Sequence, residues 1–261
     1  MAANGNPSPN PNPTLGLNHI TMKVELWEKP KPNPIVIEGF PGFGFVATIA
    51  TEYLMDHLKM RPIGKIWSPE LAPMALVHGQ RIIQPLEIFY NEKFNIVLLE
   101  AVAGVNGLEW EIADALVALC RELKAKEIIA IEGIGSQMER EEPMAFYHTN
   151  QECKVKILEG ANCKPIAEGI IFGVSGALLV KLPKDIKASF VFAETHSNLP
   201  DSKAAAKIIE VLDKYLGLKV DYKPLLKKAA DFEDKLRGII EKAKEATDLK
   251  KAKDPDTPYF G

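Results

Sequence analysis

A glycine-rich turn at residues 38–47, which reads Glu-Gly-Phe-Pro-Gly-Phe-Gly-Phe-Val-Ala, is the first segment whose spacing suits chemistry. It lies between an apolar run and a helical pattern, and Gly42, Gly44 and Ala47 satisfy the G-x-G-x-x-A form of the dinucleotide fingerprint. Backbone N–H groups in such a turn can bind an anion. The acidic residue expected about twenty positions on is missing, and no Gly-Lys-Ser/Thr follows. The phenylalanines of the turn therefore favour packing or a subunit contact.

The best acid–base candidates by position are Glu194 and His196, which follow an apolar run. Open α/β sheets bind ligands at the carboxyl ends of their strands. The favoured alternative is a polar turn that caps the helix starting near Ser202. Neither Ser136 nor Ser175 lies in a G-x-S-x-G elbow, and the histidines are scattered without metal-ligand spacing. We therefore expect no enzyme, no cofactor and no metal.

Strands that alternate with helices must position these residues. Apolar runs predict strands at residues 20–27, 35–38, 63–67, 81–90, 95–100, 127–132, 169–172 and 188–193. Helical patterns cover residues 43–58, 108–123, 175–181 and 202–216, and Asn106 with Glu109 three residues on is a start signal for the second of these. Continuous Val, Ile and Leu runs are typical of a sheet covered on both faces. The pattern predicts an α/β layered domain.

Composition indicates an ordinary water-soluble chain. It has 261 residues, 46% of them hydrophobic and 26% charged, with a formal net charge of −3. That balance disfavours nucleic acid and anionic membranes as partners. No apolar run is long enough for a membrane span and no signal peptide is evident, so we expect a cytoplasmic protein. Cys120, Cys153 and Cys163 have the sparse spacing of reduced thiols, and Cys120 is predicted to lie in a helix core.

The chain divides into four predicted segments: a disordered stretch over 1–18, an α/β domain over 19–221, an amphipathic helix over 222–249 and a flexible tail over 250–261. In the helix, apolar residues alternate at spacings of four and three, which is an a/d seam. The seam packs either on its own domain, which is the commoner case, or on neighbouring subunits. Its candidate oligomer contacts are Leu225, Phe232, Leu236 and Ile239.

The tail ends in Tyr259, Phe260 and Gly261. The charged, proline-containing run before them cannot bury enough apolar surface to fold. Two aromatic rings and a free carboxylate on a flexible tether can enter a pocket on another molecule. The alternative is a frayed end that folds back on its own domain or has no role.

The order of these segments resembles the PAC2 family of proteasome-assembly-chaperone-like proteins, and most closely its archaeal members. The resemblance spans Val24 to Leu236. It is carried by the glycine turn at residues 38–44, by Glu132-Gly133, by the stretch 194–206 and by the residues from Leu216 to Leu226. Together these motifs are fairly specific.

The resemblance implies a phosphorylase-like three-layer α/β/α sandwich that forms a homo-oligomer. It also implies a non-enzymatic, ATP-independent partner of the proteasome 20S core, whose C-terminal hydrophobic-tyrosine-any motif docks on the α-subunits. The matching positions are Tyr259, Phe260 and Gly261, and Phe260 departs from the tyrosine. Two alternatives stay open. One is an enzyme or small-ligand binder that uses the Gly39–Gly44 turn as an anion site and Glu194 or His196 for proton transfer, and the other is a self-assembled scaffold.

Overall fold

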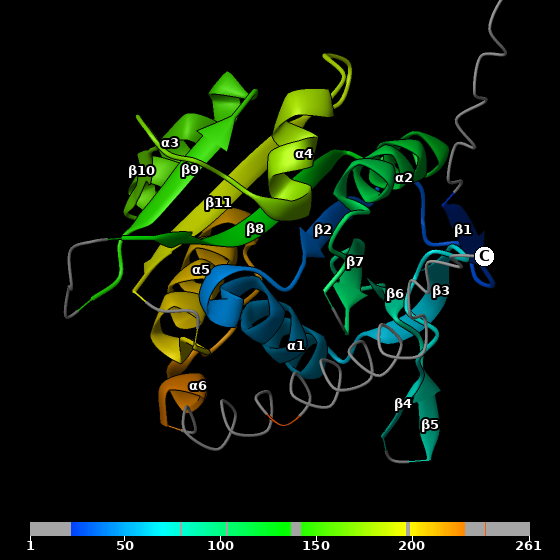
Figure 1. Cartoon of the computed structure of the whole chain (residues 1–261). Coiled ribbons are helices and arrows are strands. Elements are labelled where there is room, and N and C mark those ends of the chain that lie inside the picture. Colours follow the sequence, from blue (N-terminus) through cyan, green and yellow to red (C-terminus); the bar gives the residue numbers. More distant parts are fainter. Residues whose placement is uncertain are drawn as a thin grey trace, which may run out of the picture.

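The computed structural model describes residues 22–78, 80–102, 104–136, 142–196, 199–227 and 238. A nine-stranded sheet in the order β1-β3-β6-β7-β2-β8-β11-β9-β10 lies between two layers of helices (Figure 1). The predicted α/β sandwich is therefore confirmed. The strands are β1 Lys23–Leu26, β2 Ile35–Gly39, β3 Arg61–Trp67, β6 Leu86–Asn91, β7 Ile96–Ala101, β8 Glu127–Gly135, β9 Ala145–Thr149, β10 Cys163–Pro165 and β11 Ala188–Thr195.

The centre of the sheet is parallel. Strands β7, β2, β8 and β11 are neighbours that all run in one direction, whereas β6, β3, β1 and β9 flank them through antiparallel pairings. The parallel strands are the predicted apolar runs, buried on both sides as parallel strands usually are. Their carboxyl ends therefore meet at one edge of the sheet.

Two apolar cores lie on the two faces of the sheet. Ile37 and Ile129 contribute to the core beneath α1 and α5, while their neighbours Val36 and Ile128 contribute to the core beneath α2 and α4. This alternation follows from the two-residue period of a strand. The helices are α1 Val46–Leu58, α2 Glu109–Glu122, α3 Glu152–Gly160, α4 Gly173–Lys181, α5 Ser202–Leu216 and α6 Lys223–Lys227, and the short 3₁₀ turn η1 spans Phe43–Phe45.

The chain reverses its winding between β2 and β7. Helix α1 follows β2 and covers one face, whereas α2 follows the adjacent β7 and covers the opposite face. The connections therefore diverge above the carboxyl ends of these two strands. Open α/β sheets form a ligand crevice at such a topological switch point.

Most predicted elements are confirmed, with specific corrections. Residues 169–172 form no strand, and the sequence analysis missed β9, α3, β10 and the β4 strand Leu76–His78. The run 81–90 is split into β5 Arg81–Ile83 and β6, and β5 pairs with β4 in a separate hairpin. The capping role of Asn106 is also wrong, because α2 has its N-cap at Leu108 without a side-chain hydrogen bond. The prediction for Cys120 is confirmed, since it is buried in α2.

The last described helix, α6, lies against α5. Its Leu225 is 2% exposed and belongs to the core beneath α1 and α5. At this position the seam therefore packs on its own domain. Phe232, Leu236 and Ile239, as well as Tyr259, Phe260 and Gly261, lie outside the described residues.

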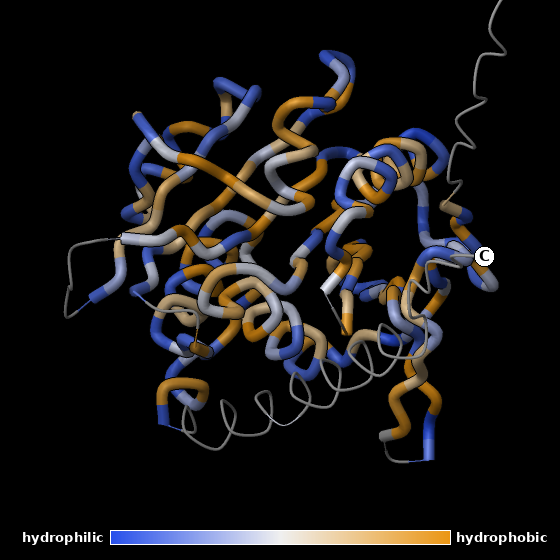
Figure 2. The backbone as a smooth tube through the Cα atoms, viewed as in Figure 1, coloured by the Kyte–Doolittle hydropathy of each residue, from blue (hydrophilic) through white to orange (hydrophobic). Residues whose placement is uncertain are grey.

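Apolar residues also occur on the surface. The β4–β5 hairpin projects from the body and is largely apolar (Figure 2), and its Val77 and Ile82 are exposed. Within the described ranges, every helix is too short or too polar to cross a membrane.

Candidate functional site

Three segments far apart in the chain meet at the carboxyl edge of the parallel strands. They are the glycine turn after β2, the Glu132-Gly133 pair in β8 and the polar end of β11. The backbone N–H of Asp201 donates a hydrogen bond of 2.9 Å to the carbonyl of Gly44. The Oγ1 of Thr195 donates to Asp201 Oδ2 at 2.8 Å. The turn is thereby joined to the entry of α5.

The polar stretch after β11 serves as a cap. Asp201 accepts a hydrogen bond from the N–H of Ala204 at 3.0 Å and is the N-cap of α5. Such caps satisfy one of the free N–H groups at a helix start. Thr195 donates a hydrogen bond to the carboxylate of Asp201. The structure therefore agrees with the interpretation of this stretch as a polar turn that caps α5. Glu194 is 8% exposed, and Ser136 Oγ donates to its Oε1 at 3.3 Å.

Two glycines permit the close approach of the turn to β8. A Cβ atom at Gly42 would overlap Oε1 of Glu132, and one at Gly133 would overlap the carbonyl oxygen of Phe43. A side chain at either position would push the glycine turn away from β8. Phe40 is buried, and Phe45 packs on the core beneath α1 and α5. Two of the three phenylalanines therefore stabilise the fold, as the packing interpretation expected.

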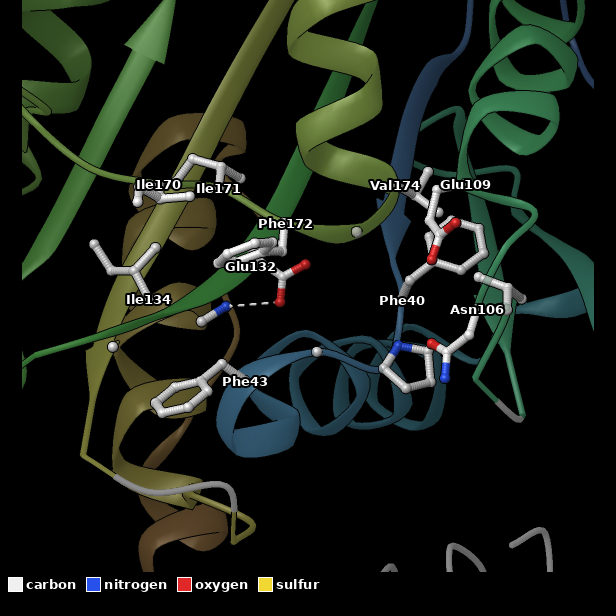
Figure 3. A pocket seen from close by; sticks show the side chains of 16 residues that line it. Phe40, Phe43, Asn106, Glu109, Glu132, Ile134, Ile170, Ile171, Phe172 and Val174 are labelled. Atoms are coloured by element: carbon white, nitrogen blue, oxygen red, sulfur yellow. Dashed lines mark hydrogen bonds between the residues drawn. The ribbon is translucent and has the colours of Figure 1, made fainter. Parts of the chain in front are cut away.

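A cavity of about 630 Å³ opens at the switch point. Its walls come from the turn after β2, the loop between β7 and α2, the end of β8, and the segment that leads into α4 (Figure 3). The Glu132 carboxyl points into the cavity, and Phe43, Ile134 and Phe172 lie on one side of it. The other lining residues are Phe40, Pro41, Gly42, Val105, Asn106, Glu109, Gly133, Gly135, Ile170, Ile171, Gly173 and Val174.

Two carboxyl groups lie in or behind this cavity. Burial raises the pKa of Glu38 to about 8, opposed by the hydrogen bond of 2.9 Å that Ser175 Oγ donates to its Oε1. Burial, and then the neighbouring Glu38, hold the pKa of Glu132 well above its usual range. The N–H of Gly133 donates to Glu132 Oε1 at 3.2 Å and opposes that rise. Both groups therefore favour the protonated, neutral form.

This geometry disfavours the anion-site interpretation of the Gly39–Gly44 turn. A phosphate at the turn would meet the Glu132 carboxyl, and no Lys, Arg or His occurs among the described residues that line the cavity. Neither Glu194 nor His196 lines it either. The structure thus does not bring the turn and the candidate acid–base pair into one site.

In the described part of the chain, no group of three or more His, Cys, Asp or Glu is placed to hold a metal.

Sequence reasoning overlooked the two carboxyls, although a signal was present. Glu38-Gly39 and Glu132-Gly133 are the same dipeptide, each near the carboxyl end of an apolar strand. Strands β2 and β8 are parallel neighbours, which brings the two acids to the same edge.

The segment 169–172 was also misassigned, because its apolar residues suggested a strand. Ile170 and Phe172 are instead 78% exposed at the cavity mouth.

We expect Glu38→Gln to weaken the pH dependence of stability. Above about pH 4.5 an unfolded chain ionises Glu38, whereas the folded protein keeps the proton until about pH 8. Stability is therefore lost as the pH rises through this window, by roughly 1 kcal/mol per pH unit for one such group. Urea unfolding at several pH values between these limits measures the slope. Glu122→Gln, at an exposed carboxylate of α2, is the control, and equal slopes for both variants would contradict the expectation.

The fold and the joined motifs define an α/β sandwich of the PAC2 class. The sequence model of the PAC2 family matches residues 36–240, most of the chain, so the chain belongs to the PAC2 family. It is similar to the crystal structure of Pyrococcus furiosus PbaA, described as an archaeal homolog of proteasome-assembly chaperone. The two are 34% identical with a TM-score of 0.75, over 86% of this chain and 100% of that one.

Two further proteins are similar to this chain, one in fold and one in sequence. The structure of Pyrococcus furiosus PbaB, described as an archaeal proteasome activator, shares the fold with a TM-score of 0.70 and 23% identity, over 84% of this chain and 98% of that one. An uncharacterized protein of Methanocaldococcus jannaschii is 28% identical over 214 residues, which are 80% of this chain and 86% of that protein.

Proposed function

We propose that this protein is a non-enzymatic chaperone or regulator of the proteasome. The observation that carries the proposal is the 34% identity with PbaA, an archaeal homolog of proteasome-assembly chaperone, over 86% of this chain. PbaB, an archaeal proteasome activator, has the same fold. A shared fold alone does not define function, and the identity to PbaA adds sequence similarity to it.

The C-terminal tail is the proposed point of contact. Tyr259, Phe260 and the Gly261 carboxylate would dock on α-subunits of the 20S core, since aromatic rings contribute large contact areas and a terminal carboxylate attracts cations and N–H donors. Docking of this kind requires no ATP. The packing of the glycine turn against Glu132 supports that view, because the carboxyl occupies the space beside Gly42 and no Lys, Arg or His is among the described lining residues of the cavity.

Self-association is the second part of the proposal. The a/d pattern that continues through Phe232, Leu236 and Ile239 would pack against another subunit, with Leu225 anchoring the start of the helix to its own domain. The exposed Val77 and Ile82 of the projecting hairpin are further apolar surface for such contacts. Several tails on one oligomer would bind together and raise the effective affinity.

The test is the mass of the purified protein, alone and mixed with recombinant proteasome α-subunits. We expect a mass several times 28.8 kDa for the protein alone, and a larger complex in the mixture. Multi-angle light scattering measures both. Phe232→Asp should lower the mass, because a charge in an apolar seam is buried without a partner. A monomer at micromolar concentration contradicts self-association, and an unchanged elution in the mixture contradicts the proteasome role.

A further inference from the structure

The cavity at the β2–β7 switch point has features that the proposed function does not use. Its volume of about 630 Å³ lies within the range of small-molecule sites, roughly 300–1,000 Å³. It also sits where open α/β sheets hold their ligands, beyond the carboxyl ends of strands whose helices cover opposite faces. Size and position both indicate a binding site.

The polar group at the base of this cavity is Glu132. It is 6% exposed and its carboxyl points into the cavity (Figure 3). Oε1 accepts from the neighbouring Gly133 N–H at 3.2 Å, while Oε2 has no hydrogen bond among the described residues. The neighbouring Glu38 differs, because its Oε2 is fully buried without a hydrogen-bond partner, whereas Glu132 lines the cavity. Buried polar atoms of native proteins rarely lack partners unless a ligand or water supplies them.

The ionisable side chains that line the cavity in the described part of the chain are both carboxylic acids. Among the described lining residues Glu109 is the other ionisable group, held at the rim by a hydrogen bond of 2.9 Å from the Gly107 N–H. Apart from Asn106, the remaining lining side chains are apolar or aromatic, and Phe43 and Phe172 lie near the carboxyl. An anionic ligand would find no Lys, Arg or His to pair with among the described lining residues, and it would oppose ionisation of Glu132. A carboxylate beside aromatic rings instead suits a cation, through a charge-assisted hydrogen bond and cation–π contacts.

We propose that this cavity binds a small organic cation, in which an ammonium or guanidinium group meets Glu132 and an apolar body lies against Phe43, Ile134 and Phe172. The charged group donates to Oε2 of Glu132. The apolar body fills the mouth of the cavity, where Ile170 and Phe172 are largely exposed. Gly173 lies beside the same carboxyl, and a Cβ atom there would be 3.9 Å from Oε2 of Glu132.

Binding of a cation displaces a proton. The titratable groups near Glu132 are Glu38 of β2, which acts on its pKa, and Glu109 of α2, which lines the same cavity; the segment that leads into α4 contributes none among the described lining residues. The free protein holds Glu132 protonated, because its pKa is raised by burial and by Glu38. A bound cation favours the ionised form. Affinity should therefore rise by about tenfold per pH unit until Glu132 ionises without ligand.

The test compares probes that share a benzene ring and carry a cationic, a neutral or an anionic group. Isothermal titration of the full-length protein at several pH values would use benzylamine, benzyl alcohol and benzoate. We expect saturable binding of benzylammonium that tightens as the pH rises, at least about tenfold weaker binding of the alcohol, and none of benzoate. Two further probes distinguish the source of the cation. Tighter binding of butylamine than of a lysine capped at both ends would indicate a free small amine, and tighter binding of the capped lysine would indicate a protein side chain.

Matched variants locate the site. Glu132→Gln should weaken benzylammonium binding by about tenfold or more, whereas Glu122→Gln at the far end of α2 should leave it unchanged. Phe172→Ala should weaken binding severalfold without affecting folding, because the ring is 78% exposed; it also keeps the test valid if Glu132→Gln does not fold. Equal affinity for the amine and the alcohol, unchanged binding after Glu132→Gln, or no saturable binding would overturn the proposal.

Discussion

Deletion of Tyr259, Phe260 and Gly261 is expected to reduce binding to proteasome α-subunits by about thirtyfold or more. Contacts of buried aromatic anchors are commonly worth about 2 kcal/mol or more, and 1.4 kcal/mol corresponds to roughly a tenfold change in affinity. The fold and the oligomeric state should stay intact, because terminal residues after a charged, proline-containing run contribute little to a core. Titration over surface-immobilised α-ring measures the loss.

Three further variants show whether the tail acts as a terminus. Residues added after Gly261 should weaken binding as the deletion does, since they move the carboxylate away from the end of the chain. Phe260→Tyr should bind as tightly or more tightly, because a hydroxyl can add a hydrogen bond of roughly 0.5–1.5 kcal/mol. Lys251→Ala is the control, since one solvated charge contributes only a fraction of a kcal/mol. Undiminished binding by the deletion variant would assign the contact to the folded body.

Gly133→Ala is expected to destabilise the folded protein by about 3 kcal/mol. The added methyl group would overlap the carbonyl oxygen of Phe43 and crowd Val46. That oxygen belongs to the backbone of η1, so the turn must move away from β8 to make room. Overpacking of this kind typically costs about 1–3 kcal/mol and sometimes more, and a rigid backbone neighbour places it at the upper end. Urea denaturation gives the free energy of unfolding.

The matched control is Gly160→Ala at the end of α3. A Cβ atom there meets nothing within 4 Å, and alanine is the better helix former by about 1 kcal/mol. This variant should be as stable as the parent or more stable. A Gly133→Ala protein that unfolds at the same urea concentration as the Gly160→Ala protein would mean that the turn and β8 are not packed tightly. The joined motifs at the carboxyl edge would then need another explanation.

The long elements were predictable because local pattern and burial agree. Helix α5 begins at Ser202 and ends at Leu216 as expected, since Asp201 caps its start and Gly217 takes the left-handed conformation at its end. The parallel strands are continuous apolar runs, so they can be predicted without knowing which strands they pair with. In contrast, β9 and β10 are short strands of five and three residues next to and at one edge of the sheet. Their pairing with β11 and with each other determines them, and a local pattern does not show pairing.

The candidate cavity could not be predicted from the sequence for a similar reason, because contacts between distant segments form it. The amino-acid sequence by itself determined the layered α/β class, the glycine turn and the two Glu-Gly dipeptides, because side-chain period and turn chemistry act over a few residues. Only the pairing of β2 with β8 brought Glu38 and Glu132 together, and only the packing of the 170–174 segment closed the wall beside them. Burial, which shifts the pKa of both carboxyls, arises from these long-range contacts and has no local signature in the sequence.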